Sequence, residues 1–328
     1  MILINNVLLP LNTDFENLKP VVAKELKTDI NNIINANLYR KSVDARKKDN
    51  IVFCCSITVN AKNEQQLLKK CKNATPFNEK KYNWEKADII PEYRPVVIGF
   101  GPAGMFSALT LAKAGLKPLV LERGADVDTR TKQVEDFFAG GKLNLQSNVQ
   151  FGEGGAGTFS DGKLTTRIKN TRIHKVLEEF VEAGADPAIM YQAMPHLGTD
   201  QLQVIVRSIR SKIIRLGGEV LFETKMTGLE LNENGTVAAI TAQRRAADGA
   251  ADGAADLGVV LALAVAHGLH RVVGDVAQFL QQLLGFLDID EASGHDFRLC
   301  QQAVVVGGDG QHHYDHTVFC PQLAVVQH

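Results

Sequence analysis

Residues 94–105 read RPVVIGFGPAGM, and this stretch decides the fold of the middle of the chain. Val96–Ile98 is a short apolar run, which predicts the end of a buried parallel strand. Gly99, Gly101 and Gly104 follow it with the spacing G-x-G-x-x-G. In a dinucleotide-binding turn, the first glycine permits the tight bend and the second lets the backbone approach a pyrophosphate. The third glycine lets the following helix pack closely on the strand, so the stretch predicts a phosphate-binding turn.

The residues after this turn complete a strand–helix–strand unit. Met105–Ala114 (MFSALTLAKA) predicts a helix whose first N–H groups and positive dipole end face the phosphates, and Gly115 ends it. Lys117–Leu121 (KPLVL) predicts the next parallel strand, and Glu122 follows directly. An acid at the carboxyl end of this strand accepts hydrogen bonds from ribose hydroxyls. The unit therefore predicts a dinucleotide site, and the alternative is a glycine-rich turn in an unrelated α/β protein.

The form of these motifs resembles that of flavoproteins. G-P-A-G, which contains Pro102 and Ala103, and the later E-R-G, which contains Arg123, are commoner in flavoproteins than in nicotinamide dehydrogenases. Residues 95–124 resemble the FAD-binding start of the two-dinucleotide-binding-domain flavoproteins. Residues 148–164, NVQFGEGGAGTFSDGKL, resemble the second flavin-contact segment of a bacterial family of uncharacterised FAD-dependent dehydrogenases. The resemblance implies FAD as the cofactor and a Rossmann-like domain.

Three further stretches are similar to the same family and occur in the same order. They are KSVDARKK at Lys41–Lys48, PHLGTD at Pro195–Asp200, and RSIRSKIIRLGGEVLF at Arg207–Phe222. The likeness covers about residues 1–243. It implies an FAD-dependent oxidoreductase that passes a hydride through the flavin. A small-molecule substrate would be the reaction partner, with NAD(P)H as a candidate electron donor.

The glycines at 152–157 permit positive φ and lack Cβ, so N–H groups there can line a flavin edge or a phosphate. Lys163 can stabilise negative charge on a reduced flavin, and the alternative is a flexible loop with a solvated lysine. The resemblance implies that Arg130 approaches the pyrophosphate and that the backbone of Thr224–Met226 contacts the adenine. The predicted cofactor-binding residues are Gly99, Gly101, Pro102, Ala103, Gly104, Glu122, Arg123, Arg130, Gly154, Gly155, Ala156, Gly157, Thr158, Lys163 and Lys225.

The sequence nominates no catalytic acid or base. His196, within PHLGTD, is a candidate acid–base group or substrate ligand, but a structural role is favoured for a lone histidine. His312, His313 and His316 lie near Asp309 and Asp315, which is a pattern that can bind a metal. A clustered-histidine tail need hold nothing, so no metal site is predicted.

The chain is predicted to have a mixed α/β fold with three parts. Residues 1–90 form a small α/β domain, with strands at Ile2–Leu9 and Ile51–Val59. Its helices are predicted at Glu16–Lys27 and Asn63–Lys72, and the basic run Arg40–Lys48 is interpreted as a solvated loop, with phosphate or acidic-partner binding as the alternative. Residues 91–243 form the Rossmann-like FAD-binding domain, into which a partial substrate region at about 166–200 is inserted. Residues 201–216 predict a helix, and Val220–Thr224 and Met226–Leu231 predict strands.

Residues 244–328 differ in composition from the rest. Every lysine lies at or before Lys225, and the segment begins with RRAADGAADGAADLG. We interpret this atypical tail as a non-native continuation, through a frameshift, a wrong-strand translation or a chimeric join. The alternative is a native segment in which residues 257–288 form a helix pair.

Composition excludes several classes of protein. The formal net charge is −1 and the pI is about 6.8, which argues against nucleic-acid binding by bulk charge. No apolar stretch reaches the roughly 20 residues of a membrane helix, and the N-terminus predicts a strand rather than a signal peptide. Cys54 and Cys55 lie in an apolar run, so buried thiols are favoured over redox chemistry. A cytoplasmic protein is therefore expected, with its oligomeric state left open.

Two other functions remain open at this point. The chain can be a truncated or chimeric protein that binds a dinucleotide without catalysis, since the family's last part is not recognisable in the tail. It can also be an NAD-dependent dehydrogenase, because Glu122 fits the ribose of either cofactor. The glycine-rich segment at 152–157 has no role in a simple NAD enzyme, which favours FAD.

Overall fold

The computed structural model describes residues 1–79, 81–82, 93–166, 170–233 and 237–245, together with two short strands at 261–262 and 304–305. The chain divides into two compact units. The first consists of Met1–Tyr82, Lys163–Thr165 and Lys169–His196. The second consists of Asn83–Gly162, Thr166–Ile168 and Leu197–His328. Residues 170–196 thus belong with the N-terminal residues rather than with the glycine-rich motifs.

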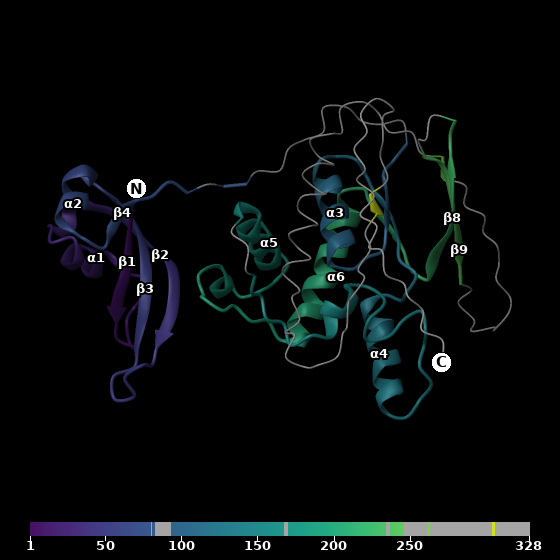
Figure 1. The fold of residues 1–328 in the computed structure, drawn as a ribbon, viewed down its shortest axis with the longest axis horizontal. Coiled ribbons are helices and arrows are strands. Elements are labelled where there is room, and N and C mark those ends of the chain that lie inside the picture. The colour runs from purple at the N-terminus through teal and green to yellow at the C-terminus, as the bar shows by residue number, and fades with distance from the viewer. Residues whose placement is uncertain are drawn as a thin grey trace. The chain divides into compact units, whose positions relative to one another are not determined.

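The first unit is built on an antiparallel sheet with the strand order β2-β3-β1-β4 (Figure 1). The strands are β1 (Ile2–Leu9), β2 (Ile33–Asp44), β3 (Val52–Ala61) and β4 (Ala74–Pro76). The helices of this unit are α1 (Lys19–Glu25), the short 3-10 helix η1 (Ile30–Asn32), α2 (Glu64–Lys70), α5 (Thr171–Glu182) and η3 (Pro187–Met190).

The core of the first unit follows from alternation along its central strands. Ile2 and Ile4 of β1 are buried, and a bulge at Asn6, with φ of 57°, shifts the alternation so that Val7 and Leu9 are buried next. Cys55 of β3 joins this core, and burial raises the pKa of its thiol to about 11. The prediction of a buried thiol is confirmed for this cysteine, whereas Cys54 is only half-buried.

The basic run Arg40–Lys48 is only partly a loop. Its first five residues continue β2 to Asp44 and pair with β3, so the prediction of a loop is wrong for them. The Lys41 ammonium lies 4.9 Å from the ring centroid of Phe15 and 5.0 Å from that of Phe53. These aromatic contacts and the ladder hydrogen bonds favour a strand over a solvated turn. Beyond the strand, Arg46 forms a salt bridge with Asp44 and lowers the pKa of that carboxyl to about 2.

The second unit has three layers: an antiparallel sheet, a central sheet and a layer of helices. Its central sheet has the order β11-β5-β6-β7, in which β5, β6 and β7 are parallel and β11 is antiparallel to β5. A separate antiparallel sheet has the order β10-β9-β8. The strands are β5 (Val96–Ile98), β6 (Leu119–Leu121), β7 (Glu219–Leu221), β8 (Thr224–Leu231), β9 (Val237–Arg244), β10 (Leu261–Ala262) and β11 (Val304–Val305). The helices are α3 (Pro102–Lys113), α4 (Val127–Phe138), η2 (Gly155–Phe159) and α6 (Thr199–Arg215).

The two faces of the parallel sheet are covered by different elements. Val96, Leu119 and Leu121 point to the face that packs against Ile240 and Ala242 of β9. The opposite face carries Val97 and Val120, and α3 and α6 lie on that side, next to each other (Figure 1). Because successive side chains of a strand point to opposite faces, β5 and β6 are buried on both faces, whereas Glu219 of β7 is exposed.

The mixed α/β class predicted from the sequence is confirmed, and most predicted elements of residues 1–231 are present with slightly different ends. The tail predictions lie largely outside the described residues, including the histidine cluster at 312–316. At Leu261–Ala262 the structure has a strand, so a helix is wrong for these two residues. Among the helices of the described ranges, none is both long enough and apolar enough to cross a bilayer.

Candidate cofactor site

The first glycine-rich turn joins β5 to α3 as the sequence predicted. Gly99 has φ of +87°, which a residue with a side chain rarely adopts, and its N–H donates to the Leu121 carbonyl at 2.8 Å. A Cβ on Gly104 would lie 2.0 Å from the Gly99 carbonyl oxygen. The third glycine is therefore required for the close approach of α3 to the turn. Gly101 is the N-cap of α3 and Pro102 its first residue, and no side chain caps this helix start.

Glu122 lies where the sequence predicted it, at the carboxyl end of β6. Its side chain is buried, and its two carboxylate oxygens accept from the N–H groups of Phe100 at 2.6 Å and Gly124 at 2.8 Å. The carboxylate thus ties the first glycine-rich turn to the loop after β6. Each oxygen keeps an acceptor site beyond the one N–H that it receives. The contact with a ribose stays a prediction.

The second glycine-rich segment lies against the first. The Gly154 N–H donates to the Phe100 carbonyl at 2.8 Å, and the Glu153 N–H donates to the Ala125 carbonyl at 3.1 Å. Gly152 and Gly154 have φ of +116° and +77°. A Cβ on Gly154 would lie 2.0 Å from the Thr158 hydroxyl oxygen, so a side chain there has no room. Two motifs about 50 residues apart therefore form one backbone surface.

The predicted residues of this second segment have distinct surroundings. Gly155, Ala156, Gly157 and Thr158 form the 3-10 helix η2. Gly155 and Thr158 are buried, whereas Ala156 and Gly157 are half-buried. The Thr158 hydroxyl donates to the Glu153 carbonyl at 3.0 Å, and this buried hydrogen bond stabilises the turn of residues 153–158.

Arg130 is fully buried, and its guanidinium binds the loop of residues 148–153. Its Nε, Nη1 and Nη2 donate to the carbonyl oxygens of Asn148, Glu153 and Val149 at 2.7, 2.6 and 2.8 Å. Burial lowers the pKa of its guanidinium to about 10. Arg130 therefore holds residues 148–153 in place, and its contact with a pyrophosphate stays a prediction.

Glu153, which sequence reasoning missed, is the second buried charge of the loop. Its Oε2 accepts from the Val127 N–H at the start of α4 at 2.7 Å and lies 3.2 Å from Nη1 of Arg210 on α6. Its Oε1 is buried and receives no hydrogen bond in the structure. Burial is the largest cause that raises the pKa of this carboxyl to about 7, and Arg210 opposes it.

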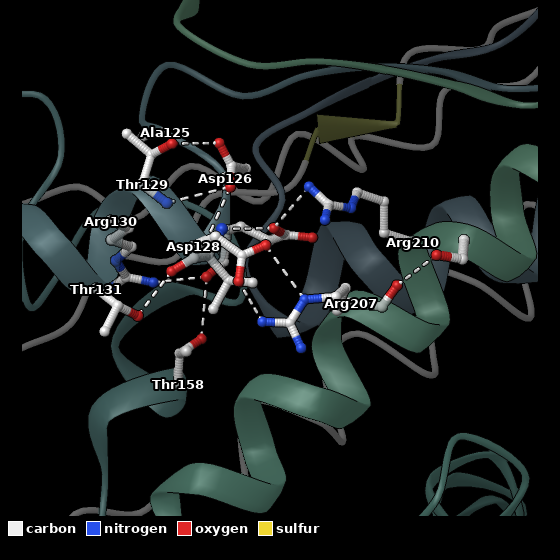
Figure 2. A network of polar contacts seen from close by, with 12 residues as sticks. Ala125, Asp126, Asp128, Thr129, Arg130, Thr131, Thr158, Arg207 and Arg210 are labelled. Carbon is white, nitrogen blue, oxygen red and sulfur yellow. Dashed lines mark hydrogen bonds and ion pairs between the residues drawn. The ribbon is translucent and has the colours of Figure 1, made fainter.

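Helices α4 and α6 are joined around this carboxyl by a polar network (Figure 2). Arg207 pairs with Asp128 at its exposed edge, and this pairing lowers the pKa of the Asp128 carboxyl. Asp126 caps α4 by accepting from the N–H groups of Asp128 and Thr129. The network thus has one pair with a buried carboxyl, Glu153 with the half-buried Arg210, and an exposed pair, Asp128 with Arg207.

The start of β8 lies beside Glu122, and its predicted contact with the adenine stays a prediction. The Thr224 N–H donates to the Glu122 carbonyl at 2.8 Å, and the Glu223 N–H donates to the Gly124 carbonyl at 2.9 Å. Lys225, the next residue, is exposed on β8. Arg123 is half-buried, with its guanidinium carbon 3.9 Å from the centroid of the Phe151 ring. Arg123 therefore lies in the loop after β6, and Lys225 lies on β8 next to Thr224.

Lys163 and His196 belong to the first unit and not to the unit that carries the two glycine-rich motifs. They form an isolated antiparallel bridge with each other, and the Leu164 N–H donates to the Pro195 carbonyl at 2.9 Å. Both residues are exposed. Their predicted roles at the flavin or the substrate stay predictions.

In the ranges that the structure describes, no group of three or more His, Cys, Asp or Glu residues is arranged to hold a metal ion. The acids around the start of α4 are instead occupied by N–H groups and arginines. The start of α3, which no side chain caps, is a helix N-terminus whose free N–H groups can bind a phosphate.

Comparison with known proteins gives matches to parts of the chain. Residues 1–60 match a family described as a domain of unknown function (DUF8436). An uncharacterized protein of Clostridium beijerinckii is 47% identical over 232 residues, which is 68% of this chain and 42% of that protein. A digeranylgeranylglycerophospholipid reductase of Methanocella arvoryzae is 28% identical over 159 residues, which is 47% of this chain and 35% of the reductase. The chain thus spans less than half the length of either relative.

Two solved structures show a weaker likeness. THI4 of Thermovibrio ammonificans has a TM-score of 0.29 at 16% identity and covers 45% of each chain. A 3-ketosteroid-delta4-(5alpha)-dehydrogenase of Rhodococcus jostii has a TM-score of 0.28 at 14% identity, over 49% of this chain and 45% of its own.

Proposed function

We propose that the second unit binds FAD in a Rossmann-like manner and that the chain is part of a flavin-dependent oxidoreductase. The observation that carries the proposal is the hydrogen bond from the Gly154 N–H to the Phe100 carbonyl. Because the Phe100 N–H also donates to Glu122, this one residue joins both glycine-rich segments and the predicted ribose ligand. The site lies at the carboxyl ends of parallel strands, where α/β proteins bind such ligands.

Each part of the cofactor would meet a group suited to it. The uncapped start of α3 would receive the pyrophosphate on its N–H groups, with the dipole favouring negative charge. Glu122 would accept from the adenosine ribose, and the backbone around Thr224 and Lys225 would border the adenine. The second glycine-rich segment would offer N–H groups without a Cβ in the way.

The bound flavin would supply the redox chemistry by accepting or donating a hydride. This chain's residues would bind it, orient it and keep water from it. The name of the Methanocella relative, a reductase, supports the oxidoreductase class. A small-molecule substrate and NAD(P)H as electron donor are parts of the proposal that the resemblance alone supports.

The first test is the visible absorption spectrum of the purified chain with and without added FAD. We expect a yellow protein whose flavin bands are shifted from those of free FAD. A spectrum identical to that of free FAD would contradict the proposal. Titration of NAD against FAD distinguishes a nicotinamide site, since an NAD site would release FAD at low concentrations of NAD.

A matched pair of variants ties the binding to the site. Gly104→Ala places a methyl group 2.0 Å from the Gly99 carbonyl oxygen, so we expect at least a tenfold loss of FAD affinity. Gly228→Ala, in β8, places its methyl group 3.4 Å from Thr241 and should bind FAD as the unaltered chain does. Equal FAD affinities for the two variants would mean that FAD binds elsewhere.

A further inference from the structure

A buried carboxyl lies inside the loop that the proposed function assigns to the cofactor. Glu153 directly precedes Gly154, whose N–H joins the two glycine-rich segments. One carboxylate oxygen of Glu153 is fixed by Val127 and Arg210, whereas the other is buried without a hydrogen bond. Buried polar atoms of folded proteins nearly always have a partner, so this exception needs an explanation.

The charges around Glu153 do not favour its ionised form as strongly as a buried carboxylate requires. Arg210 is the single cation in ion-pair contact with it among the described residues, and the Arg130 guanidinium is directed at three carbonyl oxygens instead. Burial therefore dominates and raises the pKa to about 7. The charged groups that act on this carboxyl are Arg207 and Arg210 of α6, Asp128 and Arg130 of α4, and Asp126, the N-cap of α4. Glu122 acts on Arg130.

A pyrophosphate bound at the two glycine-rich segments would bring further negative charge to this loop. Like charges raise the pKa of a carboxyl, and the effect is larger in a buried site than in water. A neutral Glu153 keeps Oε2 as acceptor for the Val127 N–H and removes the repulsion. The bound state should therefore favour the protonated carboxyl.

We propose that Glu153 is a positioning residue that holds the second glycine-rich segment against the first and takes up a proton when FAD binds. The proposal rests on the proposed function and deepens it. By linkage, a ligand that favours the protonated form must bind more weakly as pH rises. We expect FAD affinity to be about sevenfold lower at pH 8.5 than at pH 6, which corresponds to a pKa rise of about one unit on binding.

The proton can be counted directly. We would titrate the full chain with FAD by calorimetry at pH 7, in phosphate and in Tris buffer, whose ionisation enthalpies differ. Uptake of a proton makes the observed heat depend on the buffer, and we expect a fraction of one proton per FAD. A heat that is equal in both buffers would overturn the proposal.

Three variants assign the proton to its site. Glu153→Gln is neutral at every pH and keeps an oxygen for the Val127 N–H, so its FAD affinity should not vary between pH 6 and 8.5. Arg210→Gln removes the cation that opposes protonation of Glu153, so the pKa of this carboxyl should rise. The decrease of FAD affinity with pH should then occur at higher pH than in the unaltered chain. Glu219→Gln removes an exposed carboxyl that pairs with Arg94, and it should keep the pH profile of the unaltered chain.

The outcomes separate this inference from the proposed function. Failure of the unaltered chain to bind FAD at any pH would overturn the proposed function, and this inference with it. Binding of FAD with a pH profile that Glu153→Gln retains would overturn the inference alone. If Glu153→Gln fails to fold, the shifted profile of Arg210→Gln decides in its place, and an unshifted profile counts against the proposal.

Discussion

The two glycine-rich segments of the candidate site, residues 99–104 and 152–158, are held in shape by different means. In the first, the positive φ of Gly99 and the close approach of Gly104 to the Gly99 carbonyl are properties of the local backbone, and one buried side chain, Glu122, adds a hydrogen bond from the Phe100 N–H. In the second, the shape depends on Arg130, which binds three carbonyls of residues 148–153, and on the pairing of Glu153 with α4 and α6.

This difference has an energetic consequence. A turn that glycines define loses little when a distant side chain changes, because its conformation follows from φ and from close approach. A loop that buried charges define depends on every partner, since a buried polar group that loses its partner incurs the cost of its desolvation. We therefore expect the second segment to be the more sensitive of the two to distant substitutions.

The largest effect should come from removing the buried arginine. Arg130→Met keeps much of the volume of the side chain but leaves the carbonyls of Asn148, Val149 and Glu153 without their donor. We expect a loss of about 3–5 kcal/mol in the free energy of unfolding. Urea denaturation of the second unit measures it.

Lys132→Met is the matched control for this substitution. Lys132 lies on the same helix but is exposed, so the same exchange of a cation for methionine should cost no more than about 0.5 kcal/mol. Equal losses for Arg130→Met and Lys132→Met would mean that the loop does not depend on the buried guanidinium, and the contrast between the two segments would fail.

The next effect is a dependence of stability on pH. The pKa of Glu153 is raised from 4.5 to about 7 in the folded chain. A raised carboxyl pKa means that the folded state binds more protons than the unfolded state between these values. Protonation of Glu153 therefore adds to the free energy of unfolding, on the order of 3 kcal/mol in total. This stabilisation is fully present below about pH 4.5 and is lost as the pH rises through 7.

Comparison with Glu153→Gln isolates this contribution. Other carboxyls titrate as well, but Asp44, with its pKa lowered to about 2, changes charge well below this window. We expect the free energy of unfolding of the unaltered chain to fall relative to that of Glu153→Gln between pH 5 and pH 8. A constant difference between the two proteins over this range would show that Glu153 is not a buried, titrating group.

Sequence patterns predicted the first segment better than the second because its signals are local. Gly99, Gly101, Gly104 and Glu122 carry a spacing whose mechanical reasons act within one strand–turn–helix unit, and the structure has that unit. Helix α4 was missed although Asp126 is a typical N-cap, because its apolar positions are few. Helix α5 was missed despite a clear 3.6-residue pattern, since residues 166–200 were interpreted as an insert.

The supports of the second segment could not be predicted from local patterns. An acid between glycines, such as Glu153, is typical of a solvated loop, and its burial depends on Arg210 from a different helix. Arg130 was singled out, but as a ligand of the cofactor rather than of the loop. Its partners within the chain are main-chain carbonyls, which no residue type in the sequence indicates.

The smallest effect should come from the exposed pair of the α4–α6 network. Arg207 and Asp128 join the same two helices as Arg210 and Glu153 do, but their side chains are 39% and 55% exposed. Solvent screens such a pair, so Arg207→Gln should cost less than about 1 kcal/mol, and the cost should shrink further in about 1 M salt.

Arg210→Gln, one turn along α6, removes the partner of a buried carboxyl, and its effect at pH 8 should be larger and nearly independent of salt. The two helices are joined mainly at Glu153 if the salt series separates the variants in this way. A larger, salt-sensitive loss of stability for Arg207→Gln would instead mean that the exposed pair of Arg207 and Asp128 joins the two helices.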